Sequence, residues 1–160
     1  MKRVLIGALI AAFVCLAGSA AGDDAKAPAK KAAKPAAAAW KVWAAPDIKF
    51  TDVEGMKGAQ VAPLWGDMKK GPWGSLFKWV PGFLSPWHSH SHAVRVVVAQ
   101  GTFTIEPEGQ ALKELGPGSY LHDPGKSKHR SGCKDGGPDC VFFVEQNGPW
   151  DVIVAEAKKK

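Results

Sequence analysis

The apolar residues of this chain occur in short runs separated by turn-forming residues. Runs such as Ser75–Val80, Ala93–Ala99 and Val141–Glu145 are rich in β-branched and aromatic side chains, and turn pairs such as Pro81-Gly82 stand between them. No segment after Trp40 shows the apolar period of a long helix. Short strands at this spacing are typical of an all-β sandwich or barrel, so we predict one antiparallel β domain.

Composition divides the chain into four parts. Residues 1–21 have a positive start, an apolar stretch and a small-residue end, which predicts a secretory signal peptide rather than a core helix or membrane anchor. The apolar stretch is shorter than the roughly 20 residues of a spanning helix. Residues 22–39 are almost entirely Ala, Lys, Pro and Asp, which predicts a disordered linker. Residues 40–157 have the composition of a globular domain, and residues 158–160 form a basic tail. We therefore expect a periplasmic or secreted protein without stable membrane insertion.

The charge of the chain lies mostly outside the predicted domain. The formal net charge is +6, but residues 40–157 carry 12 Lys and Arg against 13 Asp and Glu. A nucleic-acid-binding domain concentrates positive charge on its folded surface. The sequence therefore argues against a nucleic-acid partner.

Two cysteines, Cys133 and Cys140, remain after the predicted signal peptide. They flank a turn that contains Gly136, Gly137 and Pro138. In an oxidising compartment an even number of nearby cysteines favours a disulfide, and we predict one here. The alternative is a pair of metal-ligating thiolates.

All five histidines lie between positions 88 and 129. His88, His90 and His92 alternate with serines, and alternate residues of a strand point to the same face, so their imidazoles are expected to converge. Neutral imidazole suits Zn, Cu, Fe and Ni. The alternative is a surface histidine run, or a polar lining of a barrel mouth, without metal.

Two spacings around these histidines resemble the motifs of the cupin superfamily. The first is a Gly, five residues, His-x-His and a closing Gly; the second is a Gly, a Pro six positions later and a His five positions after the Pro. The matching residues are Gly82, His88, His90 and Gly101 for the first motif, and Gly118, Pro124 and His129 for the second. The chain looks most like a group of small bacterial single-domain cupins.

The resemblance implies a double-stranded β-helix or jelly-roll barrel with a metal ion in its mouth. Carried over residue by residue, it implies that His88, His90 and His129 are the ligands. The chain departs from the usual pattern, because the glutamate ligand falls at Val94 or Arg95, and neither is a carboxylate. A further usual glycine is Lys126.

Four other residues are candidates for the site. His92 and His122 are each a possible fourth ligand, and His122 is also a possible acid–base group. Arg95 stands in an apolar strand, where it either points outward to an acidic partner or inward to clamp an anionic substrate. Tyr120 is either a packing residue or a phenol donor near the metal.

These features predict a cofactor and a class of chemistry. The expected cofactor is one divalent transition metal ion, Fe, Zn, Mn, Cu or Ni. Cupins with three histidines and no glutamate imply a metal-dependent oxidoreductase, dioxygenase-like, acting on a small organic acid or chelating substrate. The alternatives are a non-catalytic cupin that binds metal or a small ligand, and a metal-free cupin. The cupin resemblance also implies a homodimer.

Overall fold

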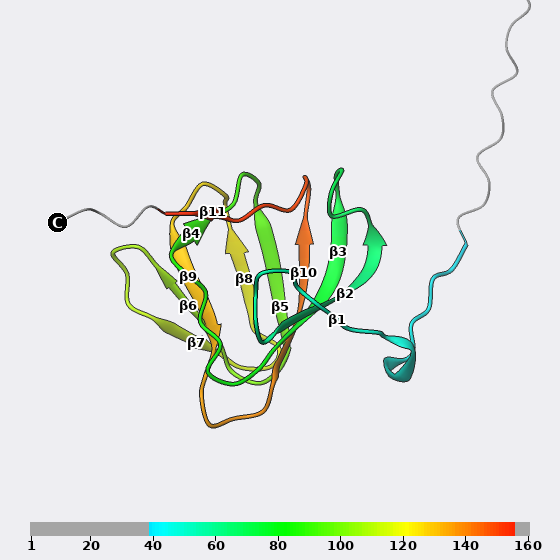
Figure 1. Ribbon diagram of the computed structural model, residues 1–160, viewed down its shortest axis with the longest axis horizontal. Helices are drawn as coiled ribbons and strands as arrows, with labels where there is room; N and C mark the ends of the chain where they lie inside the picture. The colour runs from blue at the N-terminus through cyan, green and yellow to red at the C-terminus, as the bar shows by residue number, and fades with distance from the viewer. Residues whose placement is uncertain (1–38, 156–160) are drawn as a thin grey trace, which may run out of the picture. The chain divides into compact units, whose positions relative to one another are not determined.

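The computed structural model describes residues 39–155 (Figure 1). The predicted signal peptide, almost all of the predicted linker and the basic tail lie outside these residues. Regular helix in the described part is limited to one 3-10 turn, η1 (Ala45–Asp47). No helix in residues 39–155 has the length and apolar character that crossing a membrane requires.

Within the described residues, two antiparallel sheets form the domain (Figure 1). The six-stranded sheet has the order β1-β2-β3-β10-β5-β8, with bounds Thr51–Asp52, Ala59–Gly66, Trp73–Trp79, Cys140–Gln146, Val94–Gln100 and Tyr120–Asp123. The five-stranded sheet has the order β11-β4-β9-β6-β7, with bounds Ile153–Val154, His88–Ser89, His129–Cys133, Phe103–Pro107 and Lys113–Leu115. Several neighbours in these sheets, such as β3 and β10 or β4 and β9, are far apart in sequence, as in a jelly roll. The predicted all-β fold is confirmed.

The core lies between the two sheets and follows from the alternation of side chains along the strands. In β10 every second residue is buried, from Cys140 to Gln146. Aromatic rings from three strands meet there: the Phe142 ring centroid lies 4.7 Å from that of Trp79 and 4.8 Å from that of Phe103. Such edge-on contacts add to the apolar area that the rings bury.

Two turns have backbone conformations that restrict the residue type. Gly101, between β5 and β6, has a φ of +75°, and an added Cβ would lie 2.7 Å from the carbonyl oxygen of Asp139. Only glycine fits there without displacing backbone. Lys126 has a φ of +57°, so the chain keeps a left-handed conformation at the position where the cupin pattern usually has glycine.

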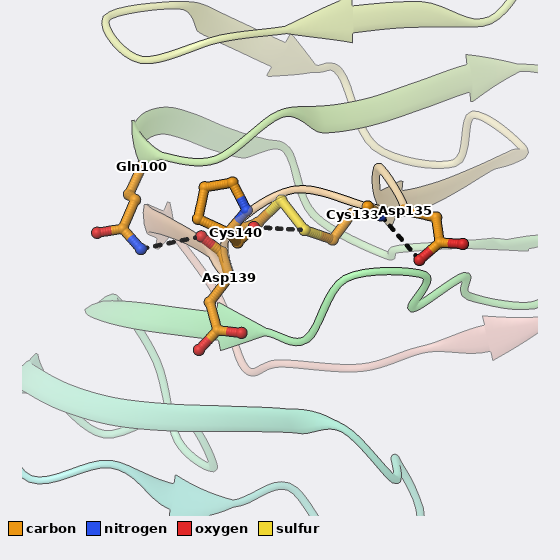
Figure 2. Close-up of a disulfide and its surroundings, with 7 residues drawn as sticks. Gln100, Cys133, Asp135, Asp139 and Cys140 are labelled. Atoms are coloured by element: carbon orange, nitrogen blue, oxygen red, sulfur yellow. Dashed lines mark hydrogen bonds between the residues drawn. A yellow bond between two sulfur atoms is a disulfide. The ribbon is translucent and has the colours of Figure 1, made fainter.

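The predicted disulfide between Cys133 and Cys140 is confirmed (Figure 2). Their α-carbons are 5.7 Å apart. Cys133 ends β9 and Cys140 begins β10, so the bond joins the two sheets. The loop that it closes lies at the end of the domain away from β4 and β11 (Figure 1). Because both sulfurs are in the disulfide, neither is a thiolate ligand.

Candidate metal centre

Three of the five histidines converge where β4 and β9 meet. His88 and His129 are direct cross-strand partners, and His90 follows β4 by one residue. Side chains of directly paired residues lie about 5 Å apart at Cβ, so this register alone brings the two predicted motifs together. One ring nitrogen from each of the three lies within 4.8 Å of the others, and all three residues are buried. The expected convergence of His88, His90 and His129 is present.

Backbone carbonyls orient all three rings. Nδ1 of His88 lies 2.8 Å from the Pro86 carbonyl oxygen, and Nδ1 of His129 lies 2.9 Å from that of Ser127.

Nδ1 of His90 lies 2.6 Å from the carbonyl oxygen of Asp151, in the segment that leads into β11. A carbonyl oxygen only accepts, so each Nδ1 carries the proton and each neutral ring keeps its lone pair on Nε2. The three Nε2 atoms are therefore the nitrogens available to a metal ion, held as in metal sites whose histidines donate their other ring proton.

Burial keeps two of these rings neutral. Loss of solvation lowers the pKa of His88 to about 4, against the opposing effect of its hydrogen bond to the Pro86 carbonyl; His129 and His90 lower it further. Burial also lowers the pKa of His90. At neutral pH both rings are therefore in the uncharged form that binds metal.

One carboxylate belongs to this region, and the sequence pattern did not reveal it. Asp123, the last residue of β8, is 8% exposed and faces the interior. Its Oδ1 accepts a hydrogen bond of 2.9 Å from the Gly125 N–H, and its Oδ2 lies 3.6 Å from Nδ1 of His129. The usable signal was strand alternation: if His122 faces outward, its neighbour Asp123 must face inward.

The three histidines lie at one side of an interior cavity of about 80 Å³. Apart from the histidines, its polar lining is Ser85, Ser131, Gln146 and Asp123, and no Lys or Arg lines it. The remaining walls are aliphatic, aromatic and Met side chains, among them Phe77, Val94, Phe103, Phe142, Val144 and Trp150. Such a mostly apolar pocket with a few converging polar groups is typical of a small-molecule site.

His92 does not join the other histidines, which corrects the expectation that it shares their face. Strand β4 ends at Ser89, and the chain bends at Ser91 and His92, so the alternation stops before His92. His92 is exposed, and its ring packs against Gly148. His92 is therefore not part of the cluster that His88, His90 and His129 form.

The three residues expected to be catalytic lie on the outer face of the six-stranded sheet, which is a second correction. In β5 the buried residues are Val94, Val96 and Val98, so Arg95 points outward, where it forms a 3.1 Å ion pair with Glu145.

His122 is the cross-strand partner of Arg95 and is exposed, and Tyr120 is 59% exposed on the same face of β8. Of the two interpretations of Arg95, the structure supports the outward, ion-paired side chain and not the inward clamp for an anionic substrate. Neither Arg95 nor His122 nor Tyr120 lines the cavity.

The residues that do converge fit a transition metal ion. Three imidazoles whose Nε2 atoms are available match the ligand preference of Zn, Cu, Fe and Ni. In addition, Asp123 Oδ2 is buried and has no hydrogen-bond partner among the described residues. A buried carboxylate oxygen without a donor is costly, and a nearby cation would remove that cost.

Comparison with known proteins agrees with this geometry. The family described as the ChrR cupin-like domain matches residues 39–149. Among curated proteins, no sequence matches the chain significantly.

Among solved structures, the polyketide cyclase RemF from Streptomyces resistomycificus is similar, with a TM-score of 0.63 and 21% identity over 75% of this chain and 89% of RemF. KdgF from Halomonas sp. has a TM-score of 0.54 and 22% identity over 65% of this chain and 92% of its own. The DMSP lyase DddQ from Ruegeria pomeroyi DSS-3 has a TM-score of 0.57 and 15% identity over 72% of this chain and 64% of its own. At these identities the structural likeness establishes the fold alone. By its fold and by the match over residues 39–149, the chain belongs to the cupin superfamily, in the family of ChrR cupin-like domains.

Proposed function

We propose that this chain is a metal-dependent oxidoreductase of the dioxygenase type, with one divalent transition metal ion on His88, His90 and His129. The observation that carries the proposal is the convergence of three buried imidazoles in the lining of a mostly apolar cavity. A metal ion there would supply Lewis-acid chemistry and, if it were iron, redox chemistry with dioxygen. The fold itself does not select this reaction, since similar structures include a cyclase and a lyase.

The cavity walls support a narrower class of substrate within this proposal. Phe77, Phe142 and Trp150 present apolar surface, which would hold the body of a small organic molecule and exclude water from it. Because Arg95 lies outside and no other cation lines the cavity, an acidic substrate has no guanidinium to bind. We therefore narrow the substrate to a small, largely apolar molecule whose oxygen atoms chelate the metal. A β-diketone has this chemistry.

The alternative is a cupin that binds metal or a small ligand without turnover. One observation favours it: the expected acid–base groups, His122 and Tyr120, are exposed on the outer face. Of the side chains that line the cavity, the Ser85 hydroxyl already accepts a 2.9 Å hydrogen bond from the backbone N–H of Ser131. A metal ion whose coordination positions were all filled by the protein would act in storage or sensing.

Three further expectations remain part of the proposal. The metal is one of Fe, Zn, Mn, Cu or Ni, and imidazole donors suit Zn, Cu, Fe and Ni. The protein is exported, which the disulfide between Cys133 and Cys140 supports, because such bonds persist in oxidising compartments. It acts as a homodimer, as the cupin resemblance implies.

The test is to purify the protein from its native host after cell fractionation, under gentle conditions. Metal content is measured by mass spectrometry for the wild type, His88→Ala and His129→Ala. His122→Ala is the matched control, because it removes an imidazole from the outer face. We expect about one metal ion per chain in the wild type and the control, and loss of metal from the other two. Oxygen uptake is then followed with the iron-loaded protein and acetylacetone.

The outcomes separate the hypotheses. Oxygen uptake that depends on His88 and His129 supports the oxidoreductase. A tightly bound metal without uptake for acetylacetone or related chelators supports the binding module and contradicts the enzyme. If the wild type is isolated without metal and takes up none of the five candidate ions, the metal centre is refuted.

A further inference from the structure

One end of the six-stranded sheet carries a row of three buried residues from adjacent strands. The register of β10 and β5 pairs Gln146 with Val94, and that of β5 and β8 pairs Val94 with Asp123. All three residues line the cavity beside the histidines. The middle residue, Val94, stands where the cupin pattern expects its glutamate ligand and offers no donor atom. Its two cross-strand neighbours both carry side-chain oxygens.

Both of those oxygens are without a hydrogen-bond partner. Asp123 Oδ2 and Gln146 Oε1 are buried, and neither makes a hydrogen bond with any described residue. The rest of each side chain is held: the Gly125 N–H donates to Asp123 Oδ1, and Gln146 Nε2 donates to the His92 carbonyl oxygen at 3.4 Å. A buried acceptor left unsatisfied costs on the order of 1–3 kcal/mol, and more if it is charged. The two unpaired oxygens therefore indicate that a group from outside the chain, such as a metal ion, binds beside them.

Asp123 is the stronger candidate for a metal ligand, because Asp carboxylates, unlike Gln amides, are common ligands of transition metal ions. Asp123 Oδ2 lies 3.6 Å from Nδ1 of His129, which already donates to the Ser127 carbonyl at 2.9 Å. A separation of 3.6 Å is too long for a hydrogen bond. Asp123 is also the one carboxylate that lines the cavity. No other acidic side chain among the described residues lines the cavity, so Asp123 is the one carboxylate that could balance the charge of a divalent ion on the three imidazoles.

We propose that Asp123 supplies the carboxylate ligand of this metal centre, from the strand beside the one that carries glutamate in the cupin pattern. The inference rests on the proposed metal site at His88, His90 and His129. Those three imidazoles form their cluster without Asp123, so the carboxylate must turn its free oxygen toward them when the ion binds. The centre then has three nitrogen donors and one oxygen donor, as the family pattern has, although the chain lacks the family's glutamate.

The test compares Co(II) binding by the purified wild type and Asp123→Asn. Asparagine has the shape of aspartate and keeps an oxygen for the Gly125 N–H, so the variant should fold. We expect the Co(II) dissociation constant, measured by competition with a chromophoric chelator, to rise at least about 10-fold. The visible absorption bands of bound Co(II) should also shift, because one ligand changes.

Two further variants serve as controls. Asp47→Asn makes the same charge change at an exposed residue of η1 and should leave affinity and spectrum unchanged. Gln146→Leu removes the other free oxygen and should change the dissociation constant less than threefold. A rescue variant, Val94→Glu combined with Asp123→Asn, returns a carboxylate to the family's position and should restore at least part of the affinity.

The outcomes separate failure of the Asp123 assignment from failure of the three-histidine site on which it rests. If the wild type binds no Co(II), the three-histidine site itself fails. If the wild type binds Co(II) and His129→Ala does not, but Asp123→Asn binds as tightly as the wild type, the carboxylate assignment alone is overturned. A weakened Asp123→Asn with an unchanged Co(II) spectrum also overturns it, because the carboxylate then acts through His129 and is not a ligand. A greater loss in Gln146→Leu than in Asp123→Asn assigns the oxygen ligand to Gln146 instead.

Discussion

The buried, neutral state of His88 makes the metal-free protein sensitive to acid. In the folded chain its pKa is about 4, mainly because the ring is shielded from water, whereas an unfolded chain has the usual value near 6.5. Between these two values the unfolded state binds more protons than the folded state. The free energy of unfolding therefore rises with pH in this window, and it falls as the pH drops from about 6.5 to about 4.

The size of the effect follows from the two pKa values. At pH 5 the unfolded His88 is almost fully protonated and the folded one mostly is not, which costs about 2 kcal/mol relative to pH 7.5. Below pH 4 the cost levels off near 3 kcal/mol. His90, whose pKa is also lowered by burial, acts in the same direction. A domain of this size has a total stability of about 5–15 kcal/mol, so the loss is large enough to measure.

The assay is urea unfolding of metal-free protein at pH 7.5, 6 and 5, followed by tryptophan fluorescence. With a typical urea slope of about 1–3 kcal/mol per molar, the His88 contribution lowers the midpoint by roughly 0.7–2 M at pH 5. His88→Gln removes the titrating group and should flatten the pH dependence by about 2 kcal/mol. His122→Gln, at an exposed position, should not. If His88→Gln loses stability toward pH 5 as steeply as the wild type, the attribution to burial of this ring is refuted.

Four other changes test the fold and the corrected site. Replacing Cys133 and Cys140 together by alanine should lower the free energy of unfolding by about 2–3 kcal/mol, by the loop-entropy estimate, as measured by urea unfolding at pH 7.5. Phe142→Ala opens a cavity in the aromatic core and should cost about 3–5 kcal/mol in the same assay; a cost below 1 kcal/mol would contradict the packing described. Lys126→Gly relieves a left-handed backbone and should leave the melting temperature unchanged or raise it, and a clear fall would argue against that conformation. Arg95→Ala should leave metal stoichiometry and affinity unaltered, because its side chain faces Glu145 on the outer face; a loss of metal would place Arg95 back at the site.

Local spacing was enough to predict the features that depend on neighbouring residues. Short β-branched runs between Gly and Pro predicted an all-β chain, because strand formation and turn formation are local properties. The seven-residue separation of Cys133 and Cys140 predicted a disulfide, because a tight turn brings such residues together. The family spacing implied that His88, His90 and His129 would meet, and cross-strand pairing of His88 with His129 is how they do.

The tertiary structure decided which side of the sheet each polar residue faces. Alternation along a strand fixes which residues share a face but not which face is inside. The sequence alone therefore left the faces of Arg95 and His122 undecided, and in the structure both lie outside. The same uncertainty hid Asp123, which stands next to His122 and points inward. The end of β4 at Ser89, which turns His92 away, depends on pairing with strands 40 and more residues distant.

Long-range contacts also decided the state of the site. The carbonyl that orients His90 comes from Asp151, 61 residues away, and no spacing in the sequence indicates it. The lowered pKa of His88 arises from burial between two sheets, which exists only once the chain has folded. The sequence by itself thus indicated the all-β fold, the disulfide and the three histidines that form the cluster. Only the packing of the sheets determined which polar residues line the mostly apolar cavity, because that depends on register and on contacts between residues far apart in the chain.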